Sequence, residues 1–382
     1  MKKIVLSIAT IATMTTASMA NETVSTEKGF LDRVHAKGDL RLRQEVIRKD
    51  NVVDKNRERY RFRYGVNVDI TDNILFETAT SSGKYNPTSG NVTFSNGTEK
   101  DDQVQEYFMD KLKVDILDIK YSFDNSWIRV GKSAHHVYRP LKTQLVWDND
   151  IRLEGVNYGY KNDNTQARVG LNRVHREKGS EDGEAINIFI AQYVNTQKLD
   201  NSKLNIGAAY YHYDNVKGNT DPYGDSAGHA HPTKGFKGNS YDAATETFTK
   251  EYQMAEFFAE VQYKDVMGKP FKLAAIGVYN FGASEENIGY DISAQYAKAK
   301  KVGQWQAAAT YRVVQKDAVF GPHNDSDFSG GGTDSEGYYA KVKYAFAKDV
   351  FVQGWWNWSD IKVSSATPVE YYRHQLDVIL KF

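Results

Sequence analysis

Residues 57–70, RERYRFRYGVNVDI, contain two interleaved patterns, and this stretch decides the fold. Side chains alternate between the two faces of a strand, so a β conformation gives the stretch one apolar face and one charged face. A helix would spread the same Arg and Tyr side chains around its whole circumference. The stretch fits either a soluble sheet on a protein core or a barrel wall with lipid outside and water inside. The apolar parity consists of Tyr60, Phe62, Tyr64, Val66, Val68 and Ile70, and the polar parity of Arg57, Arg59, Arg61, Arg63, Asn67 and Asp69.

The first twenty residues have the pattern of a secretory signal. Lys2 and Lys3 precede an apolar run at 4–12, and small residues lead to a cleavage site after Ala20. The apolar run is much shorter than the roughly 20 residues that a membrane-spanning helix needs. We therefore expect a signal peptide at 1–20, a periplasmic lead-in at 21–34 with a short helix at 26–34, and a mature protein outside the cytoplasm.

The composition favours long strands over a disulfide framework. The chain of 382 residues has 25 Tyr, 7 Pro and no Cys, and 13% of it is aromatic. Many Tyr and few Pro suit the aromatic girdles and long strands of a membrane barrel. Of the 49 Lys and Arg, 47 remain without Lys2 and Lys3, against 49 Asp and Glu, a net charge of −2. This balance gives no reason to expect nucleic acid as a partner.

The same alternation recurs along residues 35–382 and predicts one all-β domain of about sixteen strands. An even strand number, with short turns alternating with long segments, is typical of an antiparallel transmembrane β-barrel with short periplasmic turns and long external loops. A short loop is expected at 49–56, and the strand at 271–281 is the weakest because both its parities are apolar. The tight turns are expected at 71–73, 124–126, 162–164 and 347–349, and the long segments at 82–110, 134–150, 214–252 and 315–337.

The last strand is the second strong signal for a barrel. Its apolar parity ends on an aromatic residue, Phe382, which looks like the signal read by the outer-membrane assembly machinery. Together with the signal peptide and the absence of Cys, this ending predicts a protein of the cell outer membrane, surrounded by lipid. The apolar parity is Tyr372, Leu376, Val378, Leu380 and Phe382, opposite Tyr371, Arg373, Gln375, Asp377 and Lys381.

Three segments carry a family resemblance: Asn86 to Ser89, Leu145 to Asp150 followed by Glu154-Gly155-Val156, and Asp325 to Asp334. With these segments the mature chain resembles the putative porins of Gram-negative outer membranes over nearly all its length. Leu153 departs from the family, which tends to have Pro before Glu-Gly. The resemblance implies a water-filled channel for passive diffusion of small hydrophilic solutes and ions. Trimers are usual for sixteen-stranded porins, and the sequence leaves monomer and homotrimer open.

A channel needs a charged constriction, and strand parity indicates which side chains line it. Five arginines share the inward faces of two adjacent strands. The loop at 134–150 would bring carboxylates opposite them if it folded into the lumen, and two glutamates on an inward parity would add an opposing acidic wall. The resulting transverse field would orient dipolar solutes. The alternative is that the arginines only solvate the lumen and pair with local carboxylates. The candidates are Arg41, Arg43, Arg59, Arg61, Arg63, Asp148, Asp150, Glu256 and Glu260.

Catalysis and metal binding have weaker support in the sequence. His135 with His136, and His229 with His231, have no accompanying Cys or carboxylate set, so we expect loop histidines and neither metal nor cofactor. No nucleophile motif with a partnered base is present, which argues against an outer-membrane hydrolase. A surface adhesin or a substrate-specific channel that uses its long external loops stays open as the alternative function.

Overall fold

The computed structural model describes residues 29–83, 87–94, 112–175, 185–223 and 235–382. The predicted signal peptide, residues 21–28 of the lead-in, Asn86, His229 and His231 lie outside these ranges. The N-terminal unit ends at Val34 and contains η1, a 3-10 helix at Phe30–Arg33 that is shorter than the helix expected at 26–34. Across the described ranges, every helix is too short or too polar to cross a membrane.

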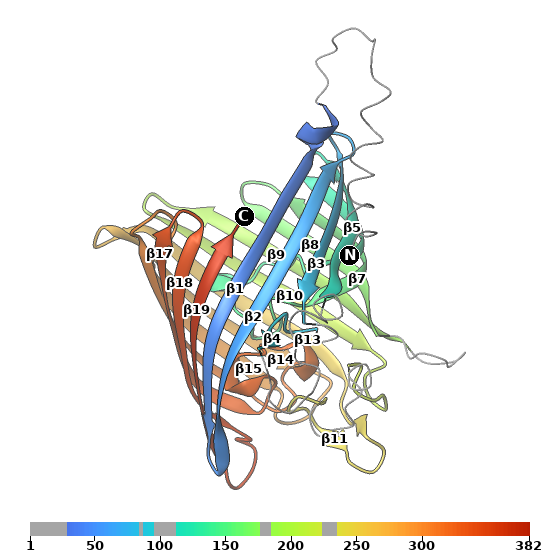
Figure 1. Ribbon diagram of the computed structural model, residues 1–382. Helices are drawn as coiled ribbons and strands as arrows, with labels where there is room; N and C mark the ends of the chain where they lie inside the picture. The colour runs from blue at the N-terminus through green and yellow to red at the C-terminus, as the bar shows by residue number, and fades with distance from the viewer. Residues whose placement is uncertain (1–28, 84–86, 95–111, 176–184, 224–234) are drawn as a thin grey trace, which may run out of the picture. The chain divides into compact units, whose positions relative to one another are not determined.

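Sixteen long antiparallel strands of the described chain form a closed barrel (Figure 1). Each long strand pairs with the next, and the last pairs with the first through partners such as Leu40 with Leu380 and Arg43 with Asp377. The barrel therefore has no free edge. The strands are β1 (Val34–Lys49), β2 (Val52–Asp69), β3 (Ile74–Ser82), β5 (Leu112–Phe123), β6 (Ser126–Ala134), β7 (Arg152–Lys161), β8 (Thr165–His175), β9 (Ile186–Lys198), β10 (Ser202–Asp214), β13 (Tyr252–Val266), β14 (Lys269–Asn280), β15 (Ile288–Ala297), β16 (Trp305–Val314), β17 (Ser335–Ala347), β18 (Val350–Ile361) and β19 (Val369–Lys381).

The connections at the two ends of the barrel differ in length. We call the end with the connections at 70–73, 124–125, 162–164 and 348–349 the turn end, and the opposite end the loop end. Short strands accompany the loop end: β4 (Val92–Thr93) pairs with β2, and β11 (Tyr241–Asp242) pairs with β12 (Thr247–Phe248). The predicted asymmetry between short turns and long loops is confirmed.

The loop expected at 49–56 is a two-residue turn, so that prediction is wrong. Asn51 has a φ of 58°, and β2 begins at Val52. Polar side chains pair across the hairpin instead: Arg48 bonds Asp54 at 3.1 Å, and Gln44 bonds Asn56. Because this hairpin lies at the loop end, its outer face needs no apolar side chains, and the alternation rule therefore missed it.

The inner wall of β9, β10, β13 and β14 is largely apolar, contrary to the polar interior expected of a channel. Loop segments cover this wall, so its side chains face protein and not water. This arrangement explains why both parities of β14 are apolar: one faces outward and the other faces the loops. The buried wall residues include Ile188, Ile190, Tyr211, Tyr213, Met254, Phe258, Ile276 and Val278, and the covering residues include Leu145, Val146, Trp147, Phe248 and Phe320.

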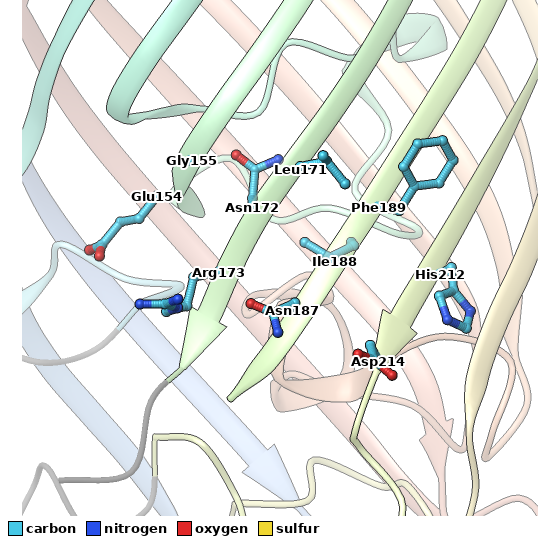
Figure 2. Close-up of a pocket in the computed structure, with 10 residues that line it drawn as sticks. All are labelled: Glu154, Gly155, Leu171, Asn172, Arg173, Asn187, Ile188, Phe189, His212 and Asp214. Carbon is cyan, nitrogen blue, oxygen red and sulfur yellow. The ribbon is translucent and has the colours of Figure 1, made fainter. Parts of the chain in front are cut away.

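Charged side chains on the outer face are grouped near the loop end, beside a surface recess on β7–β10 (Figure 2). Glu154 is the cross-strand partner of Arg173 and bonds Lys132 at 3.1 Å, while Asn187 pairs with both Arg173 and Asp214. Charges on the lipid face cost least near the membrane interface. This row therefore marks the loop-end border of the apolar outer band, and the recess lies outside the lumen.

Candidate functional site

The connection at 135–151 lies inside the barrel, where inward side chains hold it. The Tyr138 hydroxyl donates to Glu260 on β13 at 2.7 Å, and the Leu141 amide donates to the same carboxylate at 3.1 Å. The Tyr138 amide bonds Gln192 of β9 at 2.6 Å, and Thr143 bonds Asp291 of β15. We call this segment the inserted loop.

Arg139 and Trp147 hold the inserted loop in shape. The Arg139 guanidinium donates to the carbonyls of Thr143 and Trp147 at 3.0 and 2.8 Å and to Asn149 at 2.6 Å. Burial lowers the pKa of Arg139 to about 10, and Asp148 opposes this shift. Trp147 is 1% exposed and packs edge-on against Tyr211, with 5.5 Å between ring centroids. The loop is thus a folded element with its own core.

A cluster of arginines covers the wall opposite the inserted loop, on β1, β2 and β19. Seven guanidinium groups belong to it, and five carboxylates lie among them. Positive charge therefore exceeds negative charge by two within this set. We call the set the arginine cluster: Arg41, Arg43, Arg57, Arg59, Arg61, Arg63 and Arg373, with Asp39, Glu45, Asp150, Asp327 and Asp377.

Glu45 is the centre of the loop-end half of the cluster. It accepts from Arg57 and Arg373 at 2.5 Å each, and from Gln375 at 3.1 Å. Arg59 lies 3.7 Å away from the same carboxylate. One fully buried carboxylate therefore fixes guanidinium groups from two strands, and each retains further donors directed elsewhere.

Arg43 is the buried anchor of the cluster. It donates to Asp377 at 2.7 and 3.0 Å, and it lies 3.4 Å from Asp327 on the connection at 315–334. The same Asp327 is 2.8 Å from Arg373. The arginines therefore hold this second connection against the barrel wall.

The two aspartates of the inserted loop differ in environment. Asp150 pairs with Arg63 at 2.5 Å, and Asp148 accepts the amides of Asp150 and Ser326 at 2.7 and 2.9 Å. Burial favours a raised pKa for Asp150, but Arg63 and Arg61 outweigh it and lower the pKa. Burial and repulsion from Asp150 and Asp325 raise the pKa of Asp148.

The arginines that the sequence predicts to line the channel therefore differ in how far they are exposed. Arg41, Arg59, Arg61 and Arg63 keep between 12 and 20% of their side chains exposed, whereas Arg43 keeps 2%. Asp150 joins the cluster directly and does not oppose it across open space.

Glu256 and Glu260 lie on the opposite wall but are each 2% exposed. Glu256 accepts from Tyr211 at 2.8 Å, and Glu260 anchors the inserted loop. The two glutamates therefore do not form an acidic wall that faces water, because the inserted loop covers both carboxylates.

Several site residues were not predicted. Arg373 and Asp377 share the inward parity of the last strand, which was recognised in the sequence but not connected to the cluster. Arg312 is fully buried, donates twice to Asp291 at 2.8 Å and is 2.8 Å from Asp325. The alternation of β16 predicts which face of the sheet Arg312 occupies, but it does not predict the partner of Arg312. Asp325 reaches Arg312 only because the connection at 315–334 folds against the barrel wall.

The chemistry of this lumen is that of ion pairs and hydrogen bonds. Within the described ranges, no group of three or more metal-ligating side chains is present. His135 stacks on Trp147 with 5.5 Å between centroids, and burial lowers the pKa of His136 to about 3, with Arg129 and Arg168 adding to the effect. His135 is therefore packed against the inserted loop, and the His136 ring is packed against Trp127 of β6, with 5.0 Å between centroids.

A closed barrel with an apolar outer band, a charged inner wall and an inserted loop defines a class, the β-barrel channels of outer membranes. The chain matches the family described as putative porin over residues 45–263 and 272–382, and it belongs to that family. Family and fold together give an outer-membrane channel for solute diffusion. No curated protein matches the chain by sequence.

Solved structures share the fold at low identity. OprB of Pseudomonas putida is 13% identical with a TM-score of 0.58, over 92% of this chain and 95% of that one. Two mutants of the Rhodopseudomonas blastica porin are each 11% identical with a TM-score of 0.51, over 91% of this chain and 100% of theirs. At these identities the likeness concerns the architecture alone.

Proposed function

We propose that the protein is a passive diffusion channel for small hydrophilic solutes and ions, and that solutes pass along the arginine cluster. One observation carries the proposal: the inserted loop covers the apolar wall, while the arginines on the opposite wall keep part of their side chains exposed. Their side chains are 12–32% exposed, Arg43 and Arg373 excepted. An excess of two positive charges along this wall favours anions near it.

The residues have different roles in this proposal. Arg41, Arg59, Arg61 and Arg63 line the solute path, and Arg43 fixes the wall behind them. Asp150 partly neutralises the path at Arg63, since the two groups are 2.5 Å apart. Asp148 and Glu260 hold connections in place, Glu256 accepts from Tyr211 on the neighbouring strand, and none of the three meets the solute.

The same proposal includes the cellular context. Residues 1–20 are removed, the assembly machinery reads Phe382, and the barrel reaches the outer membrane with its loop end facing outside. Lipid surrounds the apolar band, and three copies assemble as a homotrimer. The exposed position of Phe382 supports the second step: the residue is 60% exposed, while its amide and carbonyl pair with Gly38.

The test is conductance in planar lipid bilayers with reversal potentials measured in a KCl gradient. Wild type is expected to conduct with anion preference, and R59Q/R61Q/R63Q is expected to shift the reversal potential toward cation preference. The control, K132Q/R48Q/R173Q, removes three charges from outward-facing positions near the loop end and keeps the wild-type value. An unchanged reversal potential in the lumen variant would exclude this wall as the solute path, and an insulating wild-type protein would exclude channel function.

A substrate-specific channel is the second candidate, because the long connections also pack into a fixed cluster of their own. Phe236, Phe248 and Phe320, from two different connections, pack into one apolar cluster with Trp147. A fixed arrangement of this kind can select a solute by shape. Liposome swelling distinguishes the candidates: a general channel shows rates that fall smoothly with solute size, and a specific one saturates with its own solute.

A further inference from the structure

A second set of basic side chains lies along β17 and β19, toward the turn end from the arginine cluster. Lys341 and Lys343 share the inward parity of β17, and Lys381 has the inward parity of β19. The Lys343 and Lys381 ammonium groups lie 4.1 and 5.5 Å from the ring centroid of Phe351, on the strand between them. The two lysines therefore approach one another over a single aromatic ring.

The inserted loop brings a fourth lysine to this set. Lys142 ends η3 (Pro140–Lys142), and its charge is close enough to interact with those of Lys343 and Lys381. Burial lowers the pKa of Lys142, and repulsion from Lys381 and other basic groups lowers it further. We call Lys142, Lys341, Lys343 and Lys381 the lysine face.

The lysine face differs from the arginine cluster in its lack of counter-charge. None of its four ammonium groups has a carboxylate within ion-pair distance in the part of the chain that the structure describes. Lys341 interacts with Asp325, Asp327 and Asp377 over a longer range, but these carboxylates already pair with arginines. By contrast, nearby Lys272 lies 3.8 Å from Glu260.

Four like charges gathered in a lumen repel one another unless an anion lies among them. A lysine ammonium is a compact, hydrated charge on a flexible stem, without the fixed fork of a guanidinium. Such groups bind an anion firmly enough to attract it and loosely enough to release it, as conduction requires. Lys341 also connects the two sets, since Arg43 and Asp327 are among its electrostatic neighbours.

We infer that the lysine face is an internal binding site for small polyvalent anions that carry phosphate or carboxylate groups. An anion attracted along the arginine cluster passes Lys341 and reaches Lys343, Lys381 and Lys142 before it leaves at the turn end. This inference rests on the proposed function, because the solute must first enter the lumen.

The experiment uses the full chain in planar bilayers. Chloride current is measured while inorganic phosphate is added, and a bound phosphate is expected to block it. K341Q/K343Q/K381Q is expected to raise the half-blocking phosphate concentration about tenfold, or about 1.4 kcal/mol. The single variant K343Q, with an expected two- to threefold effect, serves if the triple variant does not fold. Heat-dependent mobility on SDS gels reports folding for each.

The matched control is K198Q/K203Q/K264Q, which removes three lysines near the turn end of β9, β10 and β13. It is expected to keep the wild-type block. Equal loss of block in both triple variants would overturn the inference in favour of general charge at the channel mouth, and wild-type block in K341Q/K343Q/K381Q would overturn it outright.

A parallel titration with succinate separates the two ligand chemistries. If K341Q/K343Q/K381Q loses block by both anions, the result supports a general site for polyvalent anions. If this variant loses block by phosphate alone or by succinate alone, the site is assigned to that chemistry. Wild-type conductance that neither anion affects would refute this inference and leave the proposed channel standing. A wild-type protein without conductance would refute the channel itself.

Discussion

Replacement of Glu260 by alanine tests how firmly the tip of the inserted loop is held. The carboxylate accepts two hydrogen bonds from the loop, from the Tyr138 hydroxyl at 2.7 Å and the Leu141 amide at 3.1 Å. Hydrogen bonds to a charged group contribute about 1.5–3 kcal/mol each, and bonds that share one acceptor are not additive. We expect E260A to weaken docking of the tip by about 3 kcal/mol, or about two orders of magnitude in its equilibrium.

The expected phenotype is local, because Arg139 and Trp147 still hold the rest of the loop. Single-channel recordings of E260A should show greater current noise and a higher mean conductance, with a lower unfolding temperature on heated SDS gels. E260Q is the control: its amide oxygen can still accept both bonds, so we expect about half the effect. E260A recordings and unfolding temperature indistinguishable from wild type would refute the role of this carboxylate.

Three further perturbations test other parts of the structure. W147A should cost about 3–5 kcal/mol of stability, seen as a lower unfolding temperature, because it empties the centre of the buried aromatic cluster. Burial lowers the pKa of His323, which lies between the Tyr213 and Tyr223 hydroxyls, from 6.5 to about 3. The unfolded chain therefore binds a proton that the folded chain does not, and stability should fall as pH drops from 6.5 toward 3, by about 2–3 kcal/mol at pH 4.5. H323Q should flatten this dependence in thermal unfolding measured at pH 7 and 4.5, and an equally steep fall in H323Q would assign it to other groups. Deletion of Phe382 should lower the amount of folded barrel in outer membranes, whereas F382Y should preserve it, and equal amounts in wild type and the deletion would contradict the assembly role.

The barrel was predictable because its cause is local. A strand with lipid on one side must alternate, and the parity of residues 57–70 and of the last strand specifies which side faces inward. The final strand illustrates this: Leu376 and Val378 are exposed, whereas Arg373 and Asp377 are buried. Turn residues then mark where alternation stops, as at 71–73.

The site was predictable only in part, because parity gives the face of a side chain but not what covers it. Glu260 faces inward as its parity predicts, yet a hydroxyl and an amide more than a hundred residues earlier in the chain bury it. Asp150 meets Arg63 across 87 positions of sequence. Such contacts depend on how a loop packs inside the barrel, and a loop has no periodic pattern from which its packing could be read.

The apolar inner wall has a consequence for engineering. Its side chains on β9, β10, β13 and β14 pack in one cluster with the inserted loop and with Phe248 and Phe320 of two other connections, so none of these surfaces is suited to water without the others. Transplanting the loop alone into a different barrel would leave hydrophobic groups facing solvent in both donor and recipient. Chimeras of this protein should therefore exchange those four strands, residues 135–151 and the connections that carry Phe248 and Phe320 as one module.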